Sequence, residues 1–302
     1  MIYDTVVIGG GIAGLQASIQ LARSLRDVVV IDNHRGRSVA AKRYGNLLGF
    51  PDGISGEGLR HTGVVQAERL GVEFIREEAI SLGQDPSGTF RVGLDSGQSV
   101  EGRTILMATG VSDAFPALPG LSECLGVSVF ICPDCDGYEI IDRETAVIGE
   151  GPNALALAKV LTRFSRKLMI VNHTGKPVKN EELTRLQSHN IPVMDARVER
   201  MEQSGGQLQA LQLSAGDRLE VSCAFLAFPG TRPNTRLLQP FSVASNEWGY
   251  VEVDPRTKET SCRNIWAVGD ICAHSQMVSI AMGDGSQAAV WIHKRLMEEK
   301  QE

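Results

Sequence analysis

The sequence predicts an α/β protein with two Rossmann-like nucleotide-binding domains, the second of which is inserted into a discontinuous first domain. Two observations carry this prediction. An apolar strand enters a glycine-rich turn and a helix near residue 9, and the same order returns near residue 149. The length of 302 residues is enough for two domains, each with its own core. We place the first domain at 1–114 and 242–302 and the second at 115–241.

The first glycine-rich turn is a dinucleotide-binding signature. It has the form Gly-x-Gly-x-x-Gly, in which the glycines allow a tight turn, approach of a pyrophosphate and close packing of the helix. The next strand, at 28–31, ends at Asp32, whose carboxylate can accept hydrogen bonds from a ribose diol. A glycine trio alone can be only a tight turn, but the strand, the helix and Asp32 favour binding. The predicted binding residues are Gly9, Gly11, Ile12, Ala13, Gly14 and Asp32.

The second glycine-rich turn lacks this acidic partner. Its following strand, at 168–171, ends in Asn172, which disfavours selection of NAD by a ribose carboxylate. His173, Lys176 and Lys179 can meet a 2′-phosphate or be solvated loop charges, and both readings stay open. The predicted NAD(P)H-binding residues are Gly149, Gly151, Asn153, Ala154, His173 and Lys176.

Glycine and proline residues indicate where the chain crosses from one predicted domain to the other. Residues 105–110 have the pattern of a strand that ends in a tight turn, and Pro116 and Pro119 follow as a linker. A matching turn at 228–234 closes the middle domain, and the chain then reaches a Gly-Asp pair at 269–270. We therefore expect the C-terminal third to complete the first domain.

The Cys132-Pro-Asp-Cys135-Asp136 stretch is a candidate redox dithiol. A zinc site would need two more ligands at regular spacing, and the other four cysteines show none. Cysteines two residues apart can instead close a reducible disulfide, whose first thiol is acidified by its surroundings. Asp136 can exchange a proton with a thiolate or can be a mere helix cap. We predict redox chemistry at Cys132 and Cys135 and no metal.

Composition narrows the class of protein. A net charge of −6 offers no excess of positive charge for a phosphate backbone, so nucleic acid is not an expected partner. No apolar segment approaches the roughly 18 residues of a membrane span. The N-terminus shows no basic leader or cleavage site, and we expect a cytoplasmic protein.

Taken together, the motifs resemble the low-molecular-weight thioredoxin reductase family of FAD-dependent pyridine nucleotide-disulfide oxidoreductases. The resemblance covers nearly the whole chain, and it implies FAD in the first domain, NADPH and the disulfide in the middle domain, and a homodimer. It rests on residues 9–14, 46–56, 108–110, 132–136, 149–154 and 269–270.

The resemblance also assigns roles to residues. Cys135 would face the flavin, Cys132 would attack the external disulfide, and Asp136 would be the acid-base residue. Asp32 would bind the adenosine ribose, and Asp270 the ribityl or pyrophosphate region. The other residues that the resemblance brings to FAD are Asn46, Thr109, Gly110, Gly269, Gln276 and Met277.

Two departures from the family pattern leave alternatives open. The paired arginines that grip a 2′-phosphate are missing after Asn172, so the donor is NADPH, NADH or neither. The continuation to Glu139 and the 280–285 stretch look more like a branch that includes gliotoxin-type dithiol oxidases. The disulfide substrate is then a thioredoxin-like protein or a small molecule. The alternatives are a dithiol oxidase that uses oxygen, a ferredoxin-linked reductase, and a flavoprotein that senses redox state without turnover.

Overall fold

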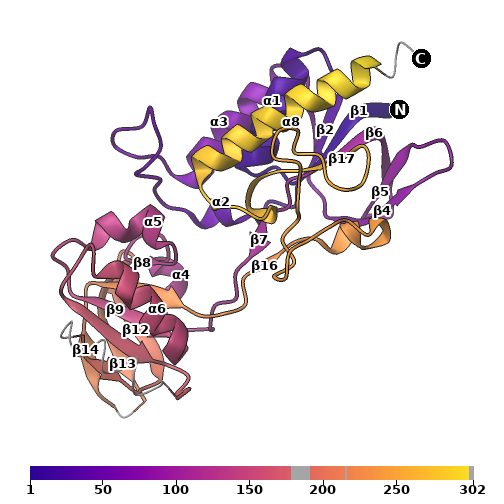
Figure 1. Cartoon of the computed structure of the whole chain (residues 1–302). Coiled ribbons are helices and arrows are strands. Elements are labelled where there is room, and N and C mark those ends of the chain that lie inside the picture. The colour runs from indigo at the N-terminus through magenta and orange to yellow at the C-terminus, as the bar shows by residue number, and fades with distance from the viewer. Residues whose placement is uncertain (178–190, 215, 299–302) are drawn as a thin grey trace. The chain divides into compact units, whose positions relative to one another are not determined.

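The computed structural model describes residues 1–177, 191–214 and 216–298, and the chain divides into two compact units (Figure 1). Each unit holds a Rossmann-like sheet with parallel strands and helices, and the predicted fold class is confirmed. Unit 1 consists of Met1–Ala40, Ile54–Ser112 and Thr231–Glu302, and unit 2 of Ala41–Gly53 and Asp113–Gly230.

Unit 1 is built on a seven-stranded sheet with the order β3-β2-β1-β6-β5-β4, in which β17 also pairs with β6. β3, β2, β1, β6 and β17 run parallel, and β5 and β4 continue the sheet antiparallel. β2 is buried throughout and β1 is buried from Thr5 onward, because the residues there are almost all apolar. The bounds are β1 Ile2–Ile8, β2 Val28–Ile31, β3 Glu73–Ile75, β4 Ala79–Gln84, β5 Phe90–Leu94, β6 Ser99–Met107 and β17 Ile265–Ala267.

Three helices of unit 1 share a core with one face of this sheet (Figure 1): α1 (Ile12–Arg23), α3 (Gly56–Glu68) and α8 (Val278–Glu298). Leu106 and Trp266 lie in this core and are at most 1% exposed. Among the helices that the structure describes, none is both long and apolar enough to cross a membrane. The shorter elements are α2 Arg37–Ala40, η2 Arg236–Phe241, η3 Gly269–Ile271 and the antiparallel pair β7 Val111–Ser112 and β16 Arg232–Pro233.

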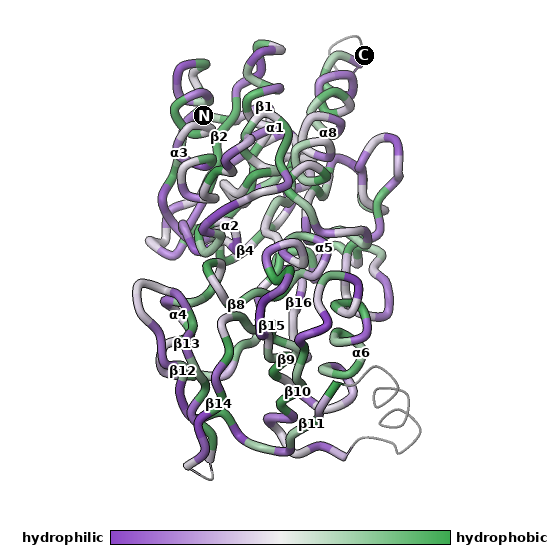
Figure 2. Tube along the Cα trace, turned by 90° about the vertical axis from the view of Figure 1, so that its left-hand side faces the viewer, coloured by the Kyte–Doolittle hydropathy of each residue, from purple (hydrophilic) through white to green (hydrophobic). Residues whose placement is uncertain are grey.

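Unit 2 contains a five-stranded parallel sheet with the order β11-β10-β9-β15-β8. Its strands β9 and β10 are among the hydrophobic stretches of Figure 2, as expected for strands covered on both sides. α6 packs on one face and an antiparallel β12-β13-β14 sheet on the other. The bounds are β8 Val129–Phe130, β9 Thr145–Gly149, β10 Leu168–Asn172, β11 Val193–Met194, β15 Cys223–Ala227, α4 Leu121–Cys124, α5 Pro133–Asp136, η1 Gly137–Ile140, α6 Gly151–Leu161, β12 Val198–Ser204, β13 Gln207–Leu213 and β14 Arg218–Glu220.

Two segments lie in a different unit from the one expected. Residues 231–241 belong to unit 1 rather than to the middle domain, because Leu237 and Leu238 are buried in the core that β1 and β5 share. Residues 41–53 belong to unit 2, where Arg43 lies 3.5 Å from Glu139. Neither segment carries a strong sequence signal for its partner, since both depend on contacts between distant parts of the chain.

Candidate active site

The first glycine-rich turn leaves room for an anionic group beside the backbone. Gly9 adopts a φ of +108°, and a Cβ there would collide with the carbonyl oxygen of Ala108. A Cβ at Gly14 would collide with the carbonyl oxygen of Gly9, whereas no atom lies within 4 Å of the Cβ position of Gly11. Gly11 caps α1 without a side-chain hydrogen bond, and Ile12 and Ala13 begin the helix. This open turn at a helix N-terminus fits a pyrophosphate.

Asp32 is held at the end of β2 by two donors. The backbone N–H of Gly10 donates to its Oδ1 at 3.0 Å, and Nη2 of Arg60 lies 2.6 Å from its Oδ2. Arg60 comes from α3, and its side chain is only 3% exposed. Its Nε is buried and has no hydrogen-bond partner among the described residues. Asp32 therefore lies where a ribose can meet it, next to a buried guanidinium that the sequence analysis missed.

A second polar cluster joins Asp270 to the start of α8. Nη1 of Arg37 lies 3.1 Å from Oδ2 of Asp270 and donates to Oε1 of Gln276 at 2.7 Å. Nε2 of Gln276 is 3.3 Å from the Tyr250 hydroxyl. Met277 precedes α8, and its carbonyl accepts the N–H of Ala281 at 2.9 Å. Three predicted FAD residues therefore lie near one another, together with an arginine that no motif predicts.

The turn at Gly269 is fixed by a buried carboxylate. Asp284 is 4% exposed, and its Oδ2 accepts the N–H of Gly269 at 3.1 Å and contacts Nε2 of His274 at 2.7 Å. Nζ of Lys258 lies 2.8 Å from Oδ1. Burial opposes the charge of Asp284, but these hydrogen bonds outweigh it and lower its pKa. The hydrogen bond to Asp284 in turn raises the pKa of His274.

The same cluster has the residue types of a cation site, since Cys272, His274 and Asp284 offer atoms within 4.8 Å of one another. Its contacts indicate a structural role instead. Burial raises the pKa of Cys272 to about 12, and the Lys258 ammonium already neutralises the carboxylate. The cluster is an ion-pair network that holds the Gly269 turn.

Thr109 and Gly110 follow β6 and lie beside the first glycine-rich turn, where Thr109 N is 3.1 Å from the Cβ position of Gly9. The Thr109 hydroxyl donates to the carbonyl of Asn234 at 2.8 Å, and Nδ2 of Asn234 donates back to the Thr109 carbonyl at 2.9 Å. Gly110 has a φ of +62° and open space at its Cβ position. Asn46, by contrast, is exposed and lies in the 41–53 segment of unit 2. Its contact with flavin stays a prediction.

The dithiol lies at the start of α5 in unit 2. Cys132 and Cys135 form a disulfide, and both residues are half-buried. Cys132 precedes the helix, and its Sγ accepts the N–H of Cys135 at 3.2 Å. Pro133 begins the helix, as is usual for that position. After reduction, this N–H would stabilise a thiolate on Cys132.

Asp136 has the properties of an acid that works near neutral pH. Burial, and then the nearby charge of Glu139, raises its pKa to about 6. Glu139 lies in η1 and faces Nη1 of Arg43 at 3.5 Å. The N–H of Asp136 donates to the carbonyl of Cys132 at 3.0 Å, so the acid is part of the same turn as the disulfide.

The second glycine-rich turn keeps its predicted shape. A Cβ at Gly149 would collide with the carbonyl oxygen of Ala227, which shows how closely β9 and β15 approach there. Gly151 begins α6, Asn153 is exposed in its first turn, and Ala154 is fully buried against the sheet. This turn can therefore bring backbone close to a second dinucleotide.

The two predicted cations beside this turn are already engaged. Nδ1 of His173 accepts the N–H of Val198 at 3.0 Å, and burial together with Arg197 lowers the pKa of His173. Nζ of Lys176 forms an ion pair with Oε1 of Glu150. Lys179 lies outside the described residues. These contacts favour a structural role for His173.

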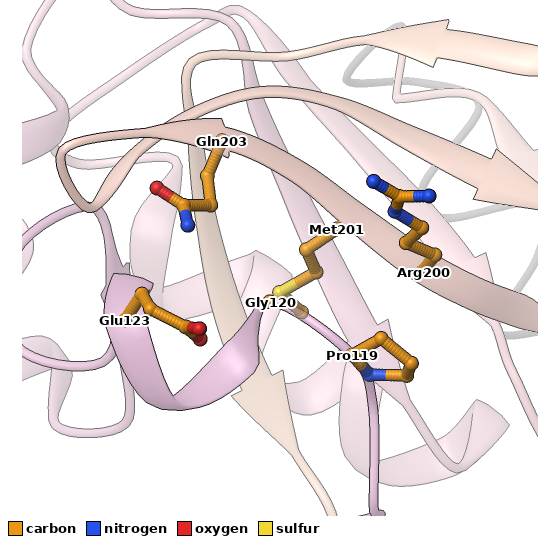
Figure 3. Close-up of a pocket in the computed structure, with 6 residues that line it drawn as sticks. All are labelled: Pro119, Gly120, Glu123, Arg200, Met201 and Gln203. Atoms are coloured by element: carbon orange, nitrogen blue, oxygen red, sulfur yellow. The ribbon is translucent and has the colours of Figure 1, made fainter.

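A shallow pocket of about 380 Å³ lies elsewhere in unit 2, between α4 and β12 (Figure 3). It contains none of the predicted site residues. Its lining residues are Pro119, Gly120, Glu123, Arg200, Met201 and Gln203.

These features define a disulfide oxidoreductase with two dinucleotide turns, and comparison with known proteins agrees. Over residues 3–285 the sequence matches the family described as pyridine nucleotide-disulphide oxidoreductase, and the chain belongs to that family. The family uses FAD and NAD(P)H in general. The chain is accordingly an FAD-dependent disulfide oxidoreductase of the thioredoxin reductase-like type.

Individual relatives cover the chain almost completely. It is 28% identical to the thioredoxin reductase of Mycolicibacterium smegmatis, over 99% of this chain and 98% of that protein. It is also 28% identical to the thioredoxin reductase of Aquifex aeolicus, over 99% and 95% of the two chains. The crystal structure of HlmI superimposes with a TM-score of 0.90 at 29% identity, over 99% and 94% of the two chains.

Proposed function

We propose that the protein uses electrons from a reduced nicotinamide nucleotide to reduce a disulfide of a thioredoxin-like protein or a small molecule. When bound, FAD supplies the link, because it accepts a hydride and delivers an electron pair to a disulfide. The observation that carries the proposal is the Cys132–Cys135 disulfide in one turn with Asp136, whose pKa is raised to about 6.

Once the dithiol is reduced, the chain's own residues account for the exchange. The Cys132 thiolate attacks one sulfur of the substrate disulfide, and the substrate's S–S bond breaks as a mixed disulfide forms. The departing thiolate takes a proton from Asp136. The Cys135 thiolate then attacks Sγ of Cys132, which restores the disulfide and releases the second substrate thiol.

The proposed FAD site combines the turn at 9–14, Asp32, Asp270 and the start of α8. Its support is the open backbone at Gly11 and the clustering of Asp270 with Gln276. We further propose a homodimer, which the resemblance to the thioredoxin reductase family implies, and a cytoplasmic location, which is expected from the N-terminal sequence. Sedimentation of the purified protein tests the oligomeric state.

The test is anaerobic stopped-flow monitoring of the bound flavin after mixing with NADH or NADPH. Rapid bleaching by a nucleotide supports a nucleotide-driven reductase. Bleaching by dithiothreitol alone contradicts it and favours a dithiol oxidase or a ferredoxin-linked enzyme. Cys132→Ser must keep flavin bleaching by nucleotide and lose turnover of the external disulfide; full turnover by this variant would refute the assigned role.

A further inference from the structure

The two glycine-rich turns differ at one equivalent position. In unit 1, β1 and β2 pair in a register that sets Ile8 against Ile31, so that the next residues, Gly9 and Asp32, follow side by side. In unit 2, the same register sets Gly149 directly against Asn172. Asn172 therefore occupies the position at which a Rossmann domain places its ribose-binding carboxylate.

The Asn172 side chain brings a carboxylate to this position from the neighbouring strand. Its Nδ2 donates to the Lys176 carbonyl at 3.0 Å and to Oδ1 of Asp195 at 2.6 Å. Both partners can only accept, which identifies the nitrogen side of the amide. Asp195 follows β11, whose Met194 is in register with Val171 of β10. An acid missing from the end of β10 is thus supplied by the end of β11.

The other polar atoms of this edge also favour donors from a ligand. Oδ1 of Asn172 is buried, and Oδ2 of Asp195 has no hydrogen bond or ion pair with any residue that the structure describes. Asp195 is exposed, so its free oxygen can be reached from solvent. Two hydroxyl groups of a ribose can donate to such a carboxylate, whereas a 2′-phosphate cannot.

Among the described residues, few positive charges near Asp195 are available to bind a 2′-phosphate. Lys176 is paired with Glu150, and the N–H of Val198 donates to Nδ1 of His173, which keeps that nitrogen unprotonated. Arg197 is exposed and lies close enough to lower the pKa of His173. It is the competing candidate for a 2′-phosphate.

We propose that Asp195, positioned by Asn172, binds the adenosine ribose of the nicotinamide nucleotide and makes this edge prefer NADH over NADPH. The inference rests on the proposed function and names the nucleotide of its donor site. The carboxylate accepts hydrogen bonds from the 2′- and 3′-hydroxyl groups and repels a 2′-phosphate.

Binding of nucleotide fragments without nicotinamide tests the proposal apart from any redox step. The FAD-loaded enzyme is titrated by calorimetry with ADP-ribose and with 2′-phospho-ADP-ribose. ADP-ribose is expected to bind at least about tenfold more tightly, the effect of one charge-assisted hydrogen bond. Asp195→Asn should weaken ADP-ribose about tenfold. Asp217→Asn, an exposed carboxylate in the β13–β14 turn, is the matched control and should change neither affinity.

Asn172→Ala separates positioning from general structural damage. This substitution should weaken the binding of ADP-ribose but not that of 2′-phospho-ADP-ribose, whereas a damaged domain would bind both fragments less well. Tighter binding of 2′-phospho-ADP-ribose than of ADP-ribose overturns the proposal, and loss of that binding in Arg197→Ala would then identify Arg197 as the phosphate-binding residue. Failure of both fragments to bind overturns the proposal as well. If 2′-phospho-ADP-ribose binds more tightly and NADPH bleaches the flavin, the proposed reductase function is supported and only the preference for NADH is refuted.

Discussion

Replacement of Asp136 by asparagine tests whether the raised pKa serves the chemistry. Burial and Glu139 raise this pKa from 3.8 to about 6. At pH 7, about one molecule in ten then carries a protonated Asp136, against about one in 1,600 at the ordinary value. The acid is therefore available for a departing thiolate at a pH where an ordinary aspartate is not. Asparagine keeps the size of the side chain but has no acidic proton to give to a thiolate.

The assay compares two disulfides with the pre-reduced enzyme under nitrogen. Remaining enzyme thiols are alkylated after a quench and counted by mass spectrometry from pH 5 to 8.5. With 2-hydroxyethyl disulfide, whose thiol is a poor leaving group, Asp136→Asn should be about 100-fold slower at pH 6. With 5,5′-dithiobis(2-nitrobenzoic acid), whose thiol leaves without protonation, the variant should be close to wild type.

The ratio of wild-type to variant rates isolates Asp136 from ionisation of the attacking thiol. This ratio should fall above pH 6, where the wild-type acid loses its proton, and Glu139→Gln should move the fall to lower pH. Asp134→Asn alters an exposed carboxylate in the same helix and should have no effect. A ratio that is flat with pH, or equal for both disulfides, would refute a general-acid role.

Three further outcomes are expected. Gly14→Ala places a methyl group against the Gly9 carbonyl and should yield protein with little bound FAD, measured by the ratio of flavin to protein absorbance. Arg37→Ala removes a partner of Asp270 and should speed loss of FAD in dilution, with an unchanged circular dichroism spectrum. His274→Gln should lower thermal stability most below pH 6.5, because the raised folded-state pKa of His274 stabilises the protein there and this gain is lost as pH rises through that pKa. An equal loss at pH 6 and pH 9 would contradict the His274 assignment.

Local sequence patterns predicted the strands and glycine turns at which we propose the cofactors bind, because those elements depend on short-range chemistry. The strand at 28–31 and both glycine-rich turns formed where their apolar runs and glycines indicated. The buried partners were not predictable in the same way. Arg60 reaches Asp32 from α3, and Asp195 reaches Asn172 from β11. Each pairing joins residues more than 20 positions apart in the chain. The one usable sequence signal was Asp195, an acid that follows the parallel strand next to β10.

The proposal for Asp195 accounts for ribose binding by a glycine turn whose following strand lacks an acid. Parallel strands end along one edge of a sheet, so adjacent strand ends are interchangeable sources of a side chain at that edge. Unit 1 has Asp32 at the end of the strand next to its turn, and unit 2 has Asn172, hydrogen-bonded to Asp195, at the equivalent place. Asn172 is 2% exposed, so its hydrogen bond to Asp195 is shielded from competing water. Nucleotide preference in such a domain therefore has to be judged from the whole edge of the sheet, because the strand after the glycine turn does not determine it alone.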